Sequence, residues 1–329
     1  MSLKRVVVTG ANGFIGQHVC RQLVESGKEV TACIRERADA SVFGNLSGSL
    51  RICRMPSLGL GADLSQILRN ADAMIHLAGR AHVMRETADD PLYEFRKVNV
   101  RGTENLASIA VQNGVRRFIY LSSIKVNGEV TEKNAFSADD PPGYCDPYGQ
   151  SKWETEERLR QIATGTAMEW VVVRPPLVYG PRVRGNFLAL MKYVSHGIPL
   201  PLGSVHNGRS LVSVYNLSDL LCLLVDHPAA ANNRFLVSDS EDISTPDLIR
   251  HIAKALHRSP RILRCPEAFL LTAGTLLRRK DAVQRLCSSL VLDRKKTSEM
   301  LGWSAPLSLD SGLDRTAEWF LKGTRSAAL

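Results

Sequence analysis

Tyr148 and Lys152 form a Tyr-x-x-x-Lys pair within the segment 147–163, whose composition predicts a helix. Side chains four residues apart lie on one face of a helix, about one turn from each other. Tyrosine has an ordinary pKa of about 10 and is a weak acid or base at neutral pH, but a neighbouring ammonium favours its phenolate form. The pair therefore predicts general acid–base chemistry by Tyr148, tuned by Lys152. A solvated helix can show the same spacing by chance, so other residues must support this reading.

Ser123 gives that support. It directly follows a segment, 117–122, that predicts a strand, and it precedes Tyr148 by twenty-five residues. In an open parallel sheet, ligands bind beyond the carboxyl ends of the strands. At that edge the hydroxyl of Ser123 can hold and polarise a substrate carbonyl beside the tyrosine.

A glycine-rich turn lies near the N-terminus, between a predicted strand at 5–9 and a predicted helix at 15–26. The turn contains three glycines, each with its own expected role. Gly10 permits a tight turn, Gly13 lets the backbone approach a pyrophosphate closely, and Gly16 allows close packing of helix on strand. The phosphates would then meet the helix N-terminus, where free N–H groups and the helix dipole favour anions. This context predicts a dinucleotide site formed by the three glycines together with Asn12, Phe14 and Ile15.

The end of the second predicted strand, 29–34, bears on which dinucleotide is bound. A carboxylate there would bind the ribose 2′-hydroxyl of NAD, whereas an arginine accommodates the 2′-phosphate of NADP. No carboxylate precedes Arg35, and a guanidinium offers bidentate bonds to a phosphate. Arg35 and Arg37 therefore favour NADP(H). NAD stays possible, because Glu36 could turn inward and bind a ribose.

The elements that must position these residues alternate between strand and helix. Further strands are expected at 73–77, 170–174 and 234–238, and a long helix at 91–113. Such alternation predicts right-handed βαβ crossovers. The expected fold class is α/β, a Rossmann-type doubly wound parallel sheet with helices on both faces.

From Pro175 onward, prolines and glycines become frequent and the expected elements are helices, at 187–196, 245–256 and 266–279. This half predicts a smaller, mostly helical lobe that binds substrate. The expected domains are a dinucleotide-binding domain at 1–174 plus about 207–243, and a substrate-binding lobe at 175–206 and 244–329.

Composition narrows the class of protein. Of the 329 residues 44% are hydrophobic, no stretch approaches the roughly 20 apolar residues that span a bilayer, and the first apolar run is too short for a secretory signal. Seven scattered cysteines without a Cys-x-x-Cys pair predict reduced thiols in a cytoplasmic protein and no metal site. The net charge is +9, with twelve Lys/Arg against four Asp/Glu in 250–300. We interpret this basic surface as a solvated face or an aid in attracting a diphosphate ligand, since no nucleic-acid-binding pattern accompanies it.

Six motifs follow one another along nearly the whole chain: TGANGFIG (9–16), HLAG (76–79), VNVRGT (98–103), YLSSIKVNG (120–128), DPYGQSK (146–152) and VVRPPLVYGP (172–181). In this combination the chain resembles the extended short-chain dehydrogenase/reductase superfamily, and within it the NAD-dependent epimerase/dehydratase family. The nucleotide-sugar branch of that family is the most similar.

The resemblance implies roles for single residues. Ser123, Tyr148 and Lys152 would be the catalytic triad, and Lys152 would also bind the nicotinamide ribose. Asn99 would support the site from a central helix, and Pro175 would line the nicotinamide. The strand end that would contact the cofactor comprises Leu77, Ala78 and Gly79.

Substrate contacts are also implied. Asn186, in the sequence GNF, and Arg209, in GRSLV, match segments that touch the nucleoside diphosphate in nucleotide-sugar members, and Arg285 is expected as a second diphosphate ligand. Ser123 and Lys125 complete the expected substrate contacts. Asn186 as a helix cap and Arg209 as a surface charge remain open alternatives.

Two reactions fit these residues. The run Ser122 to Lys125 lacks the acids with which dehydratases of the family eliminate water, so a dehydratase is not expected. The favoured reaction is NADP(H)-dependent reduction at C4 of a UDP-linked 4-keto-6-deoxy-(N-acetyl)hexosamine in the biosynthesis of cell-surface polysaccharide such as O-antigen. The alternative is an NAD-dependent UDP-sugar 4-epimerase acting on UDP-glucose or UDP-N-acetylglucosamine.

A third hypothesis comes from another class of protein. A cofactor sensor without catalysis would usually lack the tyrosine or the lysine, and this chain has both. The resemblance further implies a homodimer formed through the helices at 91–113 and 147–163.

Overall fold

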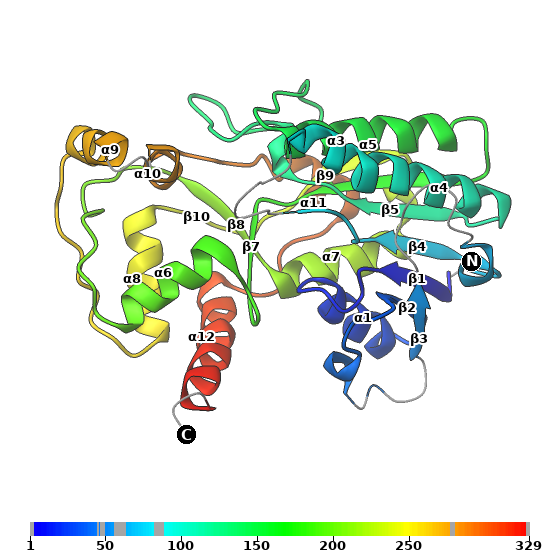
Figure 1. Cartoon of the computed structure of the whole chain (residues 1–329), viewed down its shortest axis with the longest axis horizontal. Helices are drawn as coiled ribbons and strands as arrows, with labels where there is room; N and C mark the ends of the chain where they lie inside the picture. The colour runs from blue at the N-terminus through cyan, green and yellow to red at the C-terminus, as the bar shows by residue number, and fades with distance from the viewer. Residues whose placement is uncertain are drawn as a thin grey trace.

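The computed structural model describes residues 3–44, 46, 50–55, 64–81, 89–276 and 280–326. Its framework is a seven-stranded parallel sheet in the order β3-β2-β1-β4-β5-β6-β9 (Figure 1). The strands are β1 (Arg5–Thr9), β2 (Glu29–Arg35), β3 (Leu50–Met55), β4 (Ala73–His76), β5 (Arg117–Leu121), β6 (Glu169–Arg174) and β9 (Asn233–Leu236). The strand order turns back between β1 and β4, which is where ligands of such sheets bind. The predicted Rossmann-type α/β fold is confirmed.

Helices cover both faces of this sheet. On one face, α1 (Gly16–Glu25) packs against α7 (Val214–Asp226); on the other, α4 (Gly102–Gln112) packs against α5 (Pro147–Ala163) and the short α2 (Ser65–Leu68). The edge strand β3 is largely exposed, whereas the central strands are buried on both faces; all five residues of β5 are buried, for example. Burial on two faces explains why the strands are continuous apolar runs rather than alternating ones.

The long helix predicted at 91–113 is interrupted. An α-helix, α3 (Pro91–Phe95), passes into a π-helical segment, Arg96–Arg101, before α4 begins. The wider π turn locally changes the direction of side chains, and such turns are frequent at functional sites. Here the π segment contains the buried Asn99.

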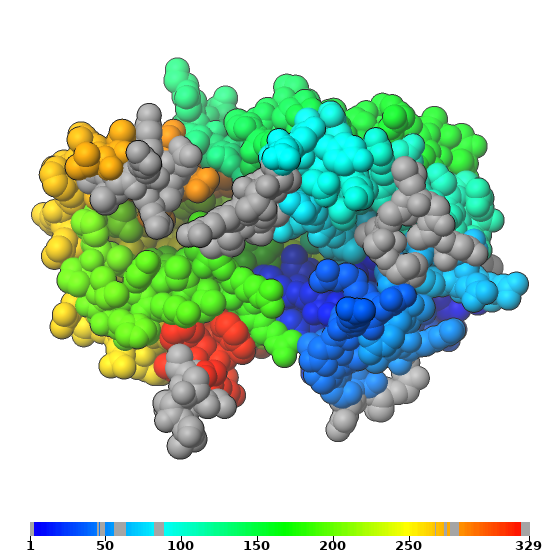
Figure 2. Space-filling view, in the orientation of Figure 1, coloured from blue at the N-terminus to red at the C-terminus, as the bar shows by residue number. Residues whose placement is uncertain are grey.

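A second group of elements forms the other half of the molecule. Its three-stranded sheet has the order β10-β8-β7, with β7 (Leu177–Tyr179) parallel to β8 (Arg209–Ser213) and β10 (Asp242–Ile243) antiparallel to it. The helices are α6 (Gly185–Ser195), α8 (Thr245–Ala255), α9 (Glu267–Leu276), α10 (Lys280–Cys287) and α12 (Leu309–Ser326), while α11 (Lys295–Leu301) packs on β9. Figure 2 shows the N-terminal elements at one end of the molecule and most of the C-terminal ones at the other. Among the described residues, no helix combines the length and apolarity needed to cross a bilayer.

Separate hydrophobic cores support the two halves. Two clusters of buried side chains lie on the faces of the large sheet, and a third joins α6, α8 and α12 around Tyr179 and Phe187. The residues 209–213, assigned from the sequence to the dinucleotide domain, form β8 in the small sheet, whereas α7 and β9 pack with the large one. The predicted domain boundaries themselves stay a prediction.

Candidate functional site

The glycine-rich turn connects β1 to α1 at the carboxyl edge of the sheet. Gly10 has φ +65°, and a Cβ atom there would lie 2.9 Å from the backbone nitrogen of Ala78. A Cβ atom on Gly16 would lie 2.2 Å from the Gly10 carbonyl oxygen. Gly13 donates its N–H to that same oxygen at 2.9 Å. These positions are therefore restricted to glycine by close backbone packing, as the sequence predicts.

The N-terminus of α1 is open to an anion. The helix begins after Ile15 without a side-chain cap, and its first turn contains no acidic residue. Asn12 and Gly13 are partly or fully exposed in front of it. Phe14 packs instead against the core of the C-terminal half. A helix start of this kind, preceded by close-packed glycines, fits the pyrophosphate of a dinucleotide.

Arg35 and Arg37 lie where the ribose of that dinucleotide is expected. Arg35 ends β2, and both side chains are exposed. The turn that follows β2 is held by Arg54 at the end of β3, which donates to the carbonyl oxygens of Ala38, at 3.1 Å, and of Glu36. Two exposed guanidinium groups therefore lie on a fixed turn, and among the described residues no buried carboxylate lies at this strand end.

Ser123 and Tyr148 meet at the ends of β5 and β6. Ser123 precedes a 3₁₀ turn, Ile124–Val126, and its hydroxyl accepts a hydrogen bond from the backbone N–H of Lys125 at 3.3 Å. Its side chain also hydrogen-bonds Tyr148, in the first turn of α5. The N–H of Ile124 donates to the Pro175 carbonyl oxygen at 3.0 Å, which places Pro175 beside the serine.

Lys152 lies one turn along α5 from Tyr148. Its ammonium donates to the Leu121 carbonyl oxygen at 2.9 Å and lies 5.8 Å from the centroid of the Tyr148 ring. Burial raises the pKa of Tyr148 to about 12, although the hydrogen bond with Ser123 opposes the shift. Burial lowers the pKa of Lys152 to about 8, and the charge of Glu156 opposes it. The structure thus brings the three predicted catalytic residues together, with a lysine whose proton is labile close to neutral pH.

The strand end Leu77 to Gly79 lies between the glycine turn and this triad. A Cβ atom on Gly79 would lie 3.0 Å from Asn99 Oδ1 and 3.7 Å from Lys152 Nζ. Asn99 accepts from the Arg80 N–H at 2.8 Å and donates to Ser151 Oγ at 3.0 Å. Asn99 therefore ties the strand end to α5, as expected of a supporting residue, and Leu77, Ala78 and Gly79 occupy the interval where a cofactor would cross.

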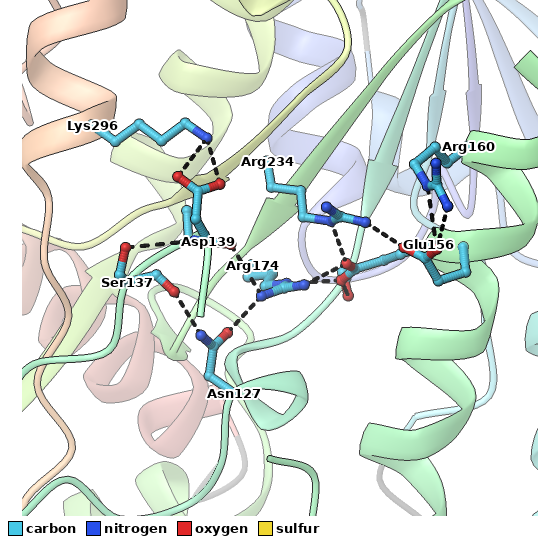
Figure 3. A network of polar contacts seen from close by, with 11 residues as sticks. Asn127, Ser137, Asp139, Glu156, Arg160, Arg174, Arg234 and Lys296 are labelled. Carbon is cyan, nitrogen blue, oxygen red and sulfur yellow. Dashed lines mark hydrogen bonds and ion pairs between the residues drawn. The ribbon is translucent and has the colours of Figure 1, made fainter. Parts of the chain in front are cut away.

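A buried ionic network surrounds Glu156 on α5 (Figure 3). Glu156, one turn beyond Lys152, is fully buried and paired with the buried Arg174, whose Nη2 lies 2.6 Å from Glu156 Oε2. The same carboxylate accepts from Ser122 Oγ at 2.5 Å and from Arg234 Nε at 3.2 Å. Arg174 also donates to Asn127 Oδ1 at 2.9 Å. Ser122 and Asn127 flank the turn that starts at Ser123, so the network fixes that turn relative to α5.

Lys125 forms ion pairs with two carboxylates of the protein. Its ammonium pairs with Glu129 at 2.5 Å and with Asp146. Burial lowers the pKa of Lys125, but the hydrogen bonds that its ammonium donates to these carboxylates outweigh this effect and raise the pKa overall. Asp146 is also the N-cap of α5, accepting from the Gly149 N–H at 2.6 Å. Lys125 thus joins the Ser123 turn to the helix that carries Tyr148, and its role as a substrate contact stays a prediction.

Arg209 and Arg285 come together in the C-terminal half, although 76 residues separate them in sequence. Arg209 donates to the carbonyl oxygens of Arg285, at 2.9 Å, and of Ser288, at 3.2 Å. Burial lowers the pKa of Arg209, and the positive charge of Arg285 adds to this effect. Asn186 is exposed at the start of α6, where Arg184 occupies the capping position. The positive charge of Arg285 acts unfavourably on the Arg209 guanidinium, and an anion bound beside them would offset that repulsion.

Several residues of the site were not predicted, namely Glu156, Asp146, Arg54 and the pairing role of Arg174. Glu156 follows Lys152 at the i, i+4 spacing of a helix, a signal that the sequence does contain. Arg174 and Arg54 find their partners in other segments of the chain, as Asp146 does with Lys125, and helical or strand periodicity does not reveal such contacts. Within the part of the chain that the structure describes, no three His, Cys, Asp or Glu side chains gather to hold a metal ion.

Comparison with known proteins gives consistent findings. The family model described as "NAD dependent epimerase/dehydratase family" matches residues 6–237. A "UDP-glucose 4-epimerase" of Vibrio cholerae is 41% identical over 325 residues, covering 97% of this chain and 96% of its own. An Escherichia coli O157:H7 protein, "N-acetyl-alpha-D-glucosaminyl-diphospho-ditrans,octacis-undecaprenol 4-epimerase", is 27% identical, covering 78% of this chain and 80% of its own. The structure "MoeE5 in complex with UDP-glucuronic acid and NAD" matches with a TM-score of 0.76 and 25% identity, covering 97% of this chain and 99% of that one.

Proposed function

The chain belongs to the NAD-dependent epimerase/dehydratase family, and from this premise we propose that it is a UDP-sugar 4-epimerase that uses NAD. The reading rests on the Vibrio cholerae relative, which matches almost the full length of both chains. The comparisons thus favour the epimerase, held above as the alternative, over the C4 reductase that the sequence alone favours.

One observation about the site carries the proposal: Tyr148, hydrogen-bonded to Ser123, is positioned for acid–base chemistry at a single carbon atom of the substrate. The acids around it in the described structure are engaged, since Glu156 is paired with Arg174 and both Glu129 and Asp146 with Lys125. A dehydratase, which eliminates water, needs a second acid–base side chain that acts at the neighbouring carbon atom of the sugar. Epimerisation at C4 needs one residue that removes a proton and later returns it.

The triad residues have distinct roles in this proposal. The glycine turn would hold NAD, whose nicotinamide would supply reversible hydride transfer at C4. Tyr148 removes the proton of the C4 hydroxyl as the ketone forms and returns it when the ketone is reduced from the other face. Ser123 donates a hydrogen bond to the sugar oxygen, and the Lys152 ammonium stabilises the phenolate of Tyr148.

The diphosphate of the substrate is assigned to the arginine pair. The Arg209 guanidinium contacts the backbone of Arg285 and is influenced by its charge, and guanidinium groups form bidentate, charge-assisted bonds to phosphate oxygens. Asn186 is available at the start of α6 for a polar contact with the nucleotide. The cofactor is assigned to the glycine turn, Leu77 to Gly79, Asn99 and Pro175.

A C4 ketoreductase is the second candidate, and a specific observation favours it. Arg35 and Arg37 are exposed on a fixed turn at the end of β2, without a buried carboxylate to bind a ribose 2′-hydroxyl. That arrangement suits the 2′-phosphate of NADP(H). A reductase would bind NADPH transiently, whereas an epimerase keeps its NAD.

The deciding experiment identifies the cofactor and the product together. Purified protein is denatured, any released nucleotide is identified, and untreated protein is incubated with UDP-glucose or UDP-N-acetylglucosamine and followed by NMR. Bound NAD and inversion at C4 are expected. Protein without nucleotide that binds NADPH and leaves both sugars unchanged would overturn the epimerase and favour the reductase.

Tyr148→Phe tests catalysis by the triad. Removing the phenol should lower kcat by about a hundred- to ten-thousand-fold while cofactor binding, measured by fluorescence, is retained. The matched control is Tyr144→Phe, because Tyr144 is exposed in the loop before α5. A cofactor sensor would keep its properties in both variants, and equal kcat values for the two variants would exclude the catalytic role.

A further inference from the structure

An apolar helix face is exposed at the end of the C-terminal half. In α9, Phe269 and Leu276 are 67% and 85% exposed, while Leu270 is buried on the other side of the helix. Positions separated by seven residues lie on the same face of an α-helix. Two large apolar side chains therefore share a solvent-facing side of α9, at the end of the molecule farthest from the large sheet (Figure 1).

The exposed apolar surface continues into the segment that leads to α9. Leu263 is 54% exposed and lies beside the chain near Ile198, which is 44% exposed. Backbone hydrogen bonds join these two stretches, from Leu263 N to Leu200 O at 2.9 Å and from Leu200 N to Arg261 O at 2.8 Å. We call this surface the end patch: Ile198, Leu263, Phe269 and Leu276, with the arginines Arg261 and Arg264.

The charge of the end patch is one-sided. The segment 257–266 contains three arginines and no acidic residue, and residues 257–287 contain seven Lys/Arg against two Asp/Glu. Arg258, Arg261 and Arg264 are exposed. Elsewhere on this half, Arg250 is paired with Asp247 and Lys254 with Asp310. Guanidinium groups interspersed with apolar side chains complement a surface that is both apolar and anionic.

We propose that the end patch binds the protein to the surface of an anionic membrane. Large apolar side chains of an interfacial helix enter the boundary between headgroups and acyl chains, and nearby arginines bind the lipid phosphates. With ten residues, α9 lies on such a surface and does not cross it. A surface of purely apolar side chains would instead suit a second protein. The arginines within the end patch favour a partner surface that carries phosphates.

Such docking would also orient the candidate site. α10 follows α9 and packs against it, and its Arg285 meets Arg209. Binding through the end patch therefore brings the diphosphate side of the site close to the lipid. The proposal does not depend on the reaction catalysed, because binding to a membrane needs neither substrate nor turnover.

The test is cosedimentation of the full-length protein with lipid vesicles. The protein is mixed with vesicles of phosphatidylcholine, or of phosphatidylcholine with phosphatidylglycerol, at low and high salt. Binding is expected only with phosphatidylglycerol and should weaken as salt increases. Arg261→Ala with Arg264→Ala should lower the partition coefficient by about fivefold for each arginine removed.

Apolar variants complete the test. Phe269→Glu with Leu276→Glu should abolish vesicle binding, and the matched control Ile52→Glu, at an exposed apolar residue of β3, should bind like the unaltered chain. Protein that stays in the supernatant with anionic vesicles, or variants that sediment equally, would refute the proposal. The proposal would also be refuted if the unaltered chain formed an oligomer and the Phe269/Leu276 variant did not. The end patch would then join copies of the chain. Circular dichroism of each variant separates loss of binding from loss of folding.

Discussion

Burial acts in opposite directions on the two titratable side chains of the triad. It disfavours the charged form of each, and so raises the pKa of Tyr148 to about 12 and lowers that of Lys152 to about 8. The hydrogen bond from Ser123 and the charge of Glu156 work against these shifts. The two residues therefore depend on each other, because the phenolate is favoured only while the ammonium beside it is charged.

This coupling predicts an alkaline limit to activity. Lys152 is protonated below its pKa of about 8 and neutral above it. As pH rises through that value, Tyr148 loses the positive charge that favours its phenolate, so kcat/KM should fall. The pH profile of kcat/KM reports groups of the free protein. A Lys152→Arg variant, whose guanidinium remains charged, should lack this limit whatever its absolute activity. A profile of the unaltered protein that stays level well above pH 8 would contradict the assignment.

At the scale of elements, α5 carries the active groups at successive turns. Tyr148, Lys152 and Glu156 follow one another four residues apart, and the helix begins at the Asp146 cap with Pro147 in its first turn. Asp146 also receives the Lys125 ammonium from the Ser123 turn. One carboxylate thus both starts the helix and connects it to the serine.

Asp146→Ala should therefore lower catalysis beyond its effect on stability. Loss of an N-cap costs about 1 kcal/mol of stability. Because the link to Lys125 is lost as well, Tyr148 and Ser123 would be held less firmly, and kcat should fall at temperatures where the variant is fully folded. Asp90→Ala is the matched control, since Asp90 caps α3 ahead of Pro91 in the same way. Equal kcat values for the two variants would show that Asp146 acts as a cap alone.

The elements that could be predicted from the sequence are the long ones with clear apolar patterns. β1 and α5 have the predicted bounds, and the other predicted strands of the large sheet differ at their ends by one or two residues. β3 was not predicted, because its alternating arginines do not look like a sheet strand. The leucine-rich α7 lacks a polar face that would show helical periodicity. β7 and β10, of three and two residues, are too short for any pattern.

The candidate site divides in the same way. Local sequence motifs contain the glycine turn, Ser123, Tyr148 and Lys152. Their proximity in the fold could therefore be expected from the sequence. The pairing of Arg209 with Arg285 joins distant segments, and only the resemblance suggested it. Glu156 and Arg174 are charged and yet completely buried, against the usual distribution of such residues, so composition gives no sign of them. Two expectations stay predictions: assembly as a homodimer through α3, α4 and α5, and a cytoplasmic location.

For the whole molecule, the network around Glu156 joins α5 to three neighbouring strands of the seven-stranded sheet. Glu156 lies on α5, Ser122 follows β5, Arg174 ends β6 and Arg234 lies on β9. Asn127 extends the network to the loop at 137–138, and Lys296 on α11 pairs with Asp139 in the same loop (Figure 3). A single buried carboxylate thus holds the floor of the site to three strands of the sheet.

Glu156→Gln should for this reason be among the most destabilising single changes in the chain. Removing one partner of a buried ion pair leaves the other charge uncompensated and costs about 3–5 kcal/mol. Denaturant unfolding measures this loss, and Glu157→Gln is the control, because Glu157 is only partly buried and pairs with Arg160 and Arg234 near the surface. Exposed pairs of that kind contribute about 1 kcal/mol or less.

A double variant separates the two causes of such a loss. If the cost comes from leaving Arg174 charged and unpaired, Glu156→Gln with Arg174→Met should be less destabilised than the sum of the single variants, because the unpaired charge is then absent. Additive losses would mean that the two side chains act independently of each other. A loss for Glu156→Gln no larger than for Glu157→Gln would show that the sheet and α5 are held together without the network, by apolar packing alone.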